Sequence, residues 1–182
     1  MEKREIRRFI TDQLNQLEHR EQKEQQIYDY LFALPEWKNA QSIAITLSFR
    51  NECATEPIIL KAWELGKQVV IPKVMHQEMR FFEYLPNSPL IETKMGIREP
   101  DDQAVERSLS AVDLCIVPGR AFTRQGYRVG WGGGFYDRVL ADYHGHTLAV
   151  AFERQLVSAF EVEPFDQPVQ QIVTESEVVV CQ

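Results

Sequence analysis

Residues 128–140, RVGWGGGFYDRVL, hold the densest group of residue types that can bind a charged ligand. Four of the nine glycines in the 182-residue chain stand at positions 130, 132, 133 and 134. Glycine accepts positive φ and lets a ligand approach the backbone, so such a run can direct several N–H groups at one anion. The apolar run over 135–143 predicts a helix whose first N–H groups would add to that site. The segment therefore predicts a phosphate-binding loop.

Charged side chains on both sides of the glycines suit the same ligand. Arg128 can make paired hydrogen bonds to phosphate oxygens, and the Asp137 carboxylate can hold the Mg²⁺ that accompanies a nucleotide. The two best-known phosphate loops do not match, because Phe135 stands where the G-x-G-x-x-G pattern needs glycine and no G-K-[ST] triplet is present. The segment predicts a different nucleotide loop. The alternative is a structural turn that lets a helix pack close to a strand.

The spacing of apolar residues predicts the elements that must position this loop. Over residues 3–34 apolar residues recur every three or four positions, which indicates two helices, or one helix broken near 19–23, with Pro35 ending the second. Strands are expected over 42–48, 67–74, 79–85, 112–119, 147–153 and 172–181, and a helix over 56–66. The Pro-rich, polar connection over 86–103 indicates no regular structure.

The order of these elements favours an α/β fold. Residues 42–74 form a strand–helix–strand unit, which places the two strands parallel in one sheet. We expect a single domain over 1–182, with a mostly parallel central sheet, helices on both faces and an N-terminal helical segment. In such folds ligands bind at the carboxyl ends of the parallel strands.

Composition excludes several classes of function. The formal net charge of -7 argues against nucleic-acid binding, and the sequence has no apolar run near 18 residues that would span a membrane. The charged, helical start is unlike a secretory signal. Cys53, Cys115 and Cys181 are odd in number and widely spaced, so we expect reduced thiols. These features predict a cytoplasmic protein, and we expect a monomer.

The stretch VPGRAFTRQGYRVGWGGGFYDRVL resembles the signature of the 5-formyltetrahydrofolate cyclo-ligase family, whose members typically read P-G-x-A-F-D-x-x-G-x-R-L-G-x-G-x-G-Y-Y-D. KREIR, LSFRNECAT, VIPKV, GIREP and VEPFDQPVQQIVTE follow in the family's order, so the resemblance runs nearly end to end. It implies a ligase that uses ATP as co-substrate and Mg²⁺ to convert a reduced folate, 5-formyltetrahydrofolate, into 5,10-methenyltetrahydrofolate, ADP and phosphate. A nucleotide- or folate-binding regulatory module without turnover is the alternative.

The resemblance also implies roles for individual residues. The catalytic residues would be Arg128, Tyr136 and Asp137, and the metal ligands Asp137 and Asp166. The residues that would bind ATP are Lys3, Arg4, Glu5, Ile6, Arg7, Lys73, Arg128, Val129, Gly130, Trp131, Gly132, Gly133, Gly134, Phe135 and Tyr136. The residues that would bind the folate are Leu47, Glu52, Trp131, Gly132, Gly133, Gly134 and Phe135.

Several of these residues have ordinary interpretations without the resemblance. Lys3 and Arg7 are four positions apart on one helical face and can be two solvated charges. Asp166 can be a turn residue and Glu52 a loop acid. The chain also departs from the family pattern, because Thr123 replaces the usual Asp and Phe135 lacks a hydroxyl. These departures change pocket shape or affinity and leave the implied ATP and metal groups in place.

Overall fold

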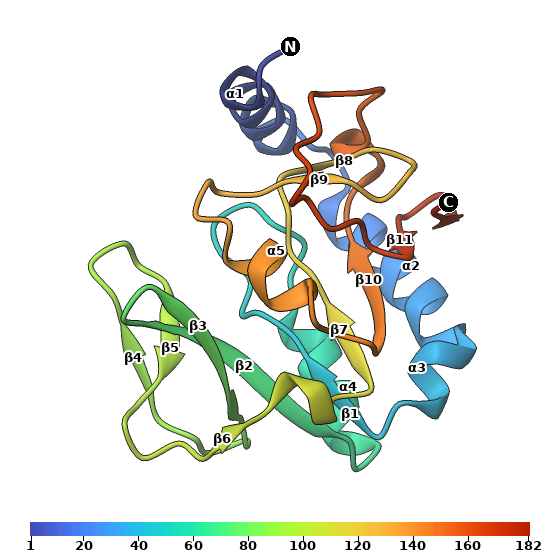
Figure 1. The fold of residues 1–182 in the computed structure, drawn as a ribbon. Coiled ribbons are helices and arrows are strands. Elements are labelled where there is room, and N and C mark those ends of the chain that lie inside the picture. The colour runs from blue at the N-terminus through green and yellow to red at the C-terminus, as the bar shows by residue number, and fades with distance from the viewer.

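The computed structural model describes residues 1–182, and eight strands form its central sheet (Figure 1). The strand order is β12-β11-β10-β7-β1-β2-β3-β6. These strands are β1 (Ser42–Ala44), β2 (Gln68–Met75), β3 (Glu78–Glu83), β6 (Glu106–Arg107), β7 (Leu114–Ile116), β10 (His146–Val150), β11 (Gln171–Val173) and β12 (Val178–Val180). Neighbours from β11 to β2 are parallel, whereas the β11–β12, β2–β3 and β3–β6 pairs are antiparallel. The expected α/β fold with a mostly parallel sheet is confirmed, and antiparallel strands extend both edges.

Two small hairpins lie outside the central sheet. One pairs β4 (Leu90–Glu92) with β5 (Arg98–Pro100), inside the connection for which no regular structure was expected, so that expectation was wrong. Gly96 adopts the positive φ, +83°, that the turn of this hairpin requires. The other pairs β8 (Ala121–Phe122) with β9 (Arg128–Val129). This second hairpin fills the interval between β7 and the glycines, and it delivers the chain to the glycine loop.

Five helices complete the fold. They are α1 (Lys3–Asn15), α2 (Arg20–Ala33), α3 (Pro35–Asn39), α4 (Glu56–Glu64) and α5 (Phe135–Leu140). The N-terminal segment is thus two helices, and Pro35 both follows α2 and opens α3 at its first position. Helix α5 has only six residues, fewer than the apolar run predicted. None of the helices is long and apolar enough to cross a membrane.

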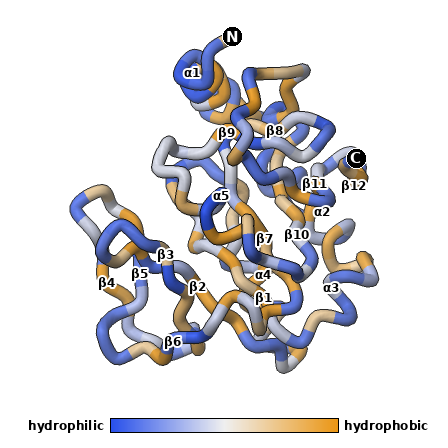
Figure 2. The backbone as a smooth tube through the Cα atoms, in the orientation of Figure 1, coloured by the Kyte–Doolittle hydropathy of each residue, from blue (hydrophilic) through white to orange (hydrophobic).

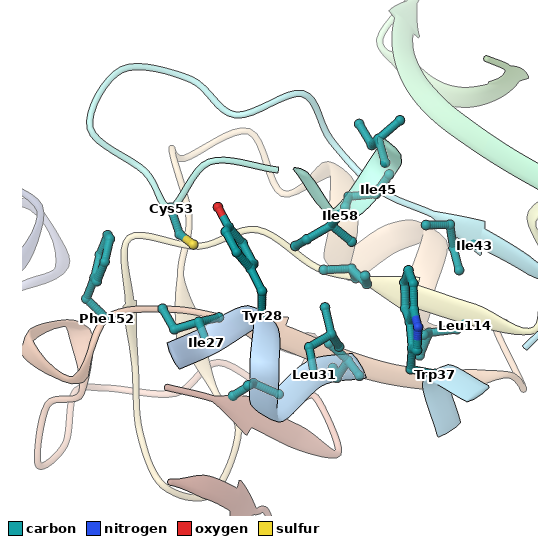
Figure 3. Packing of buried hydrophobic residues seen from close by; sticks show 14 of the residues in the cluster. Ile27, Tyr28, Leu31, Trp37, Ile43, Ile45, Cys53, Ile58, Leu114 and Phe152 are labelled. Carbon is teal, nitrogen blue, oxygen red and sulfur yellow. The ribbon is translucent and has the colours of Figure 1, made fainter. Parts of the chain in front are cut away.

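The core has two parts, one on each face of the sheet. Side chains alternate along a strand, so Ile43 of β1 joins one cluster and Ala44 joins the other. Helices α1 to α4 contribute to the first cluster, which includes Tyr28 and Leu31 of α2 and Trp37 of α3 (Figure 3). Helix α5 contributes to the second. Helices on both faces are confirmed, and hydrophobic residues gather along the central strands (Figure 2).

Candidate functional site

Helix α1 presents one polar face to the glycine loop. Residues four positions apart lie on the same face of a helix, and Lys3, Arg7 and Thr11 follow that spacing. The Lys3 Nζ lies 3.2 Å from Oδ2 of Asp166, and the Arg7 Nε donates to the carbonyl of Gly130 at 2.7 Å. The adjoining face is buried in the core through Ile6, Ile10 and Leu14. Core packing therefore fixes where the two basic side chains point.

The glycine loop has the backbone that an anion site needs. Gly132 and Gly134 adopt φ of +111° and +68°, which other residues rarely accept. A Cβ on Gly133 would lie 2.5 Å from the ring of Phe135, so close packing also requires glycine there. The backbone N–H groups of residues 130–134 donate no hydrogen bond within the protein. These N–H groups are free to bind a ligand. The six-residue helix α5 is too short to form an anion site by itself, so the loop must supply most of the donors.

Two carboxylates lie beside this loop, each paired with a cation. Oδ1 of Asp137 accepts from Arg128 at 3.2 Å and from the backbone N–H of Gln167 at 3.1 Å. Oδ2 of Asp166, the residue before Gln167, accepts from Lys3. The other oxygen of each carboxylate accepts no hydrogen bond from the protein. We call Lys3, Arg7, Arg128, Asp137 and Asp166 the charged cluster.

The charged cluster fits a magnesium ion that arrives with a phosphate ligand. Mg²⁺ at nucleotide sites is held by one or two carboxylates together with phosphate oxygens. Asp137 and Asp166 each offer one free oxygen, with side chains only 14% and 8% exposed. No group of three or more His, Cys, Asp or Glu residues forms a metal cage in the chain. A metal here would take its remaining ligands from the bound molecule and water.

Arg128 and Tyr136 meet inside the protein. The Arg128 guanidinium lies 5.6 Å from the centre of the Tyr136 ring. Burial lowers the pKa of Arg128, which the neighbouring Asp137 opposes, and burial raises the pKa of Tyr136 well above its usual value. The Arg128 Nε and the Tyr136 hydroxyl are buried without a hydrogen-bond partner. A buried polar group without a partner calls for an explanation, and a ligand that completes the site is one.

A pocket of about 780 Å³ opens next to the glycine loop. We call it the Glu52 pocket. Its lining residues are Thr11, Leu14, Asn15, Leu17, Arg20, Glu24, Ser48, Arg50, Asn51, Glu52, Ala54, Arg120 and Trp131. Trp131 forms an aromatic wall, with Phe49 edge-on to its ring at 5.9 Å between centres. Helices α1 and α2, residues 48–54 and the glycine loop thus meet around one cavity.

The carboxyl group of Glu52 changes charge near neutral pH. Burial raises its pKa to about 7. The positive charge of Arg120 and hydrogen bonds from Trp131 and from the backbone of Phe49 act in the opposite direction. An acid poised in this way, inside a cavity, is typical of a binding or catalytic site.

Only some of the predicted folate-binding residues reach this pocket. Glu52 and Trp131 line it, whereas Leu47 packs against the main core. Phe135 packs against the second core cluster, and the Arg138 guanidinium lies 4.8 Å from its ring centre. The glycines at 132–134 border the charged cluster, where a Cβ on Gly132 would meet Arg7 at 3.6 Å.

Some of the predicted ATP-binding residues lie outside the charged cluster. Lys73 of β2 donates to the carbonyl of Pro100 at 3.0 Å and pairs with Asp102 at 3.3 Å, on the side of β5. The Ile6 side chain is buried in the core, and Val129 is buried in β9. In α1, Arg4 is exposed and the Glu5 carboxylate accepts the N–H of residue 2.

Sequence reasoning missed Arg120. It is 1% exposed, lines the Glu52 pocket and lies 4.6 Å from the centre of the Trp131 ring. Arg120 stands in VPGRAF at the position that the quoted family pattern leaves open. No spacing or motif marks it, because its neighbours come from distant parts of the chain.

The fold and the two adjoining sites define an α/β protein that can hold a phosphate ligand beside a small-molecule pocket. The model of the 5-formyltetrahydrofolate cyclo-ligase family matches residues 1–175. The 5-formyltetrahydrofolate cyclo-ligase of Escherichia coli K12 is 35% identical, covering 96% of this chain and 97% of the relative. That of Mus musculus is 29% identical, covering 95% and 93%.

Solved structures agree with this match. The 5,10-methenyltetrahydrofolate synthetase of Aquifex aeolicus, solved by NMR, has a TM-score of 0.86 and 29% identity, and the likeness covers 100% of this chain and 94% of the other. A synthetase of the same name from Mycoplasma pneumoniae shares the fold, with a TM-score of 0.78 and 21% identity, over 96% and 99% of the two chains. The chain belongs to the 5-formyltetrahydrofolate cyclo-ligase family, and it is therefore a ligase.

Proposed function

We propose that this protein converts 5-formyltetrahydrofolate into 5,10-methenyltetrahydrofolate, using ATP and Mg²⁺ and releasing ADP and phosphate. The main support for the proposal is the arrangement of the charged cluster. Two cation–carboxylate pairs, the part-buried Lys3–Asp166 and the more deeply buried Arg128–Asp137, lie beside a loop whose N–H groups are free. Family membership supports the folate reaction, and the Glu52 pocket beside the cluster supports a second, organic substrate.

The charged cluster divides into groups suited to ATP and groups suited to its metal. Lys3, Arg7 and Arg128 supply positive charge for the phosphates, and the loop N–H groups supply neutral donors. Asp137 and Asp166 would hold Mg²⁺, which neutralises phosphate charge when it is bound. Phosphoryl transfer needs mainly positioning and charge neutralisation, so no nucleophilic serine or cysteine is required.

The Glu52 pocket has the chemistry to orient a pterin. An ionised Glu52 offers two acceptor oxygens to the parallel N–H groups of the pterin edge. Trp131 provides a flat apolar wall, and the same residue belongs to the glycine loop. A folate held against Trp131 would therefore lie next to the ATP phosphates.

The reaction needs such an arrangement because the formyl group on N5 is an amide. Its carbon is a poor electrophile, and its oxygen is a poor leaving group. Transfer of the γ-phosphoryl group to the formyl oxygen gives ADP and an iminium phosphate. N10 then attacks the formyl carbon, the C–O bond breaks to release phosphate, and N10 loses its proton. Arg128 and the loop N–H groups stabilise the charge that moves onto the phosphoryl oxygens.

Absorbance of the methenyl product tests the proposal. Purified protein with 5-formyltetrahydrofolate, ATP and Mg²⁺ should give the product, and omission of ATP or chelation of Mg²⁺ should remove the signal. Tight calorimetric binding of ATP without formation of ADP would instead favour the binding module without turnover. We also expect a monomer in the cytoplasm, without nucleic-acid or membrane partners, and light scattering tests the monomer.

A further inference from the structure

Arg120 is a fully buried cation that forms no ion pair. Its Nη1 donates to Oδ1 of Asn51 at 3.1 Å, and its Nη2 donates to the Thr11 hydroxyl at 2.9 Å. Both partners are neutral, and the Nε is buried without any partner. A buried charge with neutral partners carries a large desolvation cost, so its presence needs an explanation beyond packing.

The backbone around Arg120 is fixed from several sides. Its N–H donates to the carbonyl of Val129 at 2.7 Å. The Nε2 of Gln155, a residue only 2% exposed, donates to the carbonyls of Gly119 and Arg120 at 3.2 and 3.1 Å. The Oε1 of Gln155 in turn accepts the N–H of Phe152 at 2.8 Å. The guanidinium is therefore presented to the Glu52 pocket by a rigid frame.

Glu52 is the acid in the pocket that interacts with this charge. The interaction with Arg120 is the largest of those that favour the ionised form of Glu52. The other charged groups around the pocket are Arg20 and Glu24 of α2 and Arg50 of the neighbouring loop. Arg20 donates to the backbone carbonyl of Glu52 at 3.3 Å, and the Arg50 guanidinium lies 5.9 Å from the Trp131 ring centre.

We propose that Arg120 is a positioning residue that keeps the Glu52 carboxylate ionised and seats Trp131 beside it, so that the pocket can bind the pterin at neutral pH. The inference rests on the proposed folate role of Glu52. The guanidinium lies over the Trp131 indole, 4.6 Å from the ring centre, and its charge offsets the effect of burial on Glu52. Burial and Arg120 act on Glu52 in opposite directions, and their balance sets the pH at which the pocket becomes competent.

The test compares Arg120→Met with Arg120→Lys in the ligand-free protein. Lysine keeps the charge and loses the forked hydrogen bonds, whereas methionine loses both. The pH titration of Trp131 fluorescence, with Trp131→Phe as background, reports the ionisation of Glu52, and Glu52→Gln should abolish the transition. We expect a wild-type midpoint of about 7. Arg120→Met should raise the midpoint by about one pH unit or more, and Arg120→Lys should leave it near the wild-type value.

Steady-state kinetics give a second readout that a merely structural role would not produce. A one-unit rise leaves about a tenth of Glu52 ionised at pH 7 instead of about half, so KM for the folate should rise about fivefold in Arg120→Met. The two KM values should converge at about pH 9, where Glu52 is ionised in both proteins. If Arg120→Met does not fold, Arg120→Gln serves the same comparison.

Two results would overturn the inference. One is an unchanged fluorescence midpoint in Arg120→Met, and the other is an equal shift in the methionine and lysine variants, which would mark a structural role alone. Absence of turnover in the wild-type protein would refute the proposed function instead. The fluorescence titration needs no substrate, so it decides the role of Arg120 in either case.

Discussion

The charged cluster and the Glu52 pocket lie side by side, but their carboxylates have different electrostatic surroundings. In the charged cluster each acid has a cation within hydrogen-bonding distance, 3.2 Å away, and each cation comes from a different part of the chain. In the Glu52 pocket the acid forms no ion pair, and its pKa is raised to about 7. The first region is organised by ion pairs, whereas the second holds a buried acid whose pKa is shifted towards neutral pH.

The largest effect is expected from substitutions that disrupt the charged cluster. Asp137→Asn should lower kcat on the order of 10²- to 10³-fold, because it removes one proposed metal ligand and the partner of Arg128. Arg128→Ala should act in the same direction. The measurement is the rate of methenyl product at saturating substrates, with circular dichroism to confirm folding. Asp142→Asn, an exposed acid just after α5, is the matched control and should keep full activity. Near-normal turnover in Asp137→Asn would refute the metal and phosphate roles.

The next effect separates stability from function in the Glu52 pocket. A carboxyl group whose pKa is raised on folding stabilises the protein below about pH 4.5, and this contribution is lost as pH rises through about 7. At pH 8 the free energy of unfolding of Glu52→Gln should therefore be about 2–3 kcal/mol higher than that of the wild-type protein. Urea denaturation at pH 5 and pH 8 measures the difference. The control is Glu64→Gln, because Glu64 is an exposed acid that pairs with Lys61 on the surface. This variant should show no such gain in stability. A less stable Glu52→Gln at pH 8 would contradict the buried-acid account.

The wild-type protein should show the same ionisation as a change in folate affinity. In the proposed pterin site only the ionised Glu52 offers both oxygens as acceptors to the parallel N–H groups, so KM for the folate should fall about tenfold between pH 6 and pH 8. Initial rates over this range, at saturating ATP, measure it. Glu52→Gln should have a higher KM with no such slope. A flat wild-type profile would show that the charge of Glu52 does not control binding.

The smallest effect concerns the exposed side of the charged cluster. The Lys3 side chain is 30% exposed, so water screens its contact with a phosphate. Lys3→Met should weaken ATP binding about fivefold, equivalent to about 1 kcal/mol, by calorimetry with Mg²⁺ present. The control is Arg8→Met, on the same helix but exposed and away from the loop. Equal ATP affinity in Lys3→Met and wild type would remove Lys3 from the ATP site.

The residues of the two regions also differ in how well the sequence could predict them. The glycine loop, Arg128, Tyr136 and Asp137 are contiguous, so one motif located them, and apolar spacing located the helices and the parallel strands. Arg120 could not be found in this way, because its contacts with Thr11, Asn51 and Trp131 join three distant segments. The β4–β5 hairpin was missed because its turn chemistry lies within a polar, Pro-rich stretch.

The proposed phosphoryl transfer, from ATP at the charged cluster to the folate in the neighbouring pocket, can be followed by isotope labelling. The most direct measurement uses 5-formyltetrahydrofolate carrying ¹⁸O in the formyl group, with ATP, Mg²⁺ and the wild-type protein. Mass spectrometry of the released phosphate should find one ¹⁸O atom for each methenyl product and each ADP formed. Unlabelled phosphate, or methenyl product formed without ADP, would contradict the account.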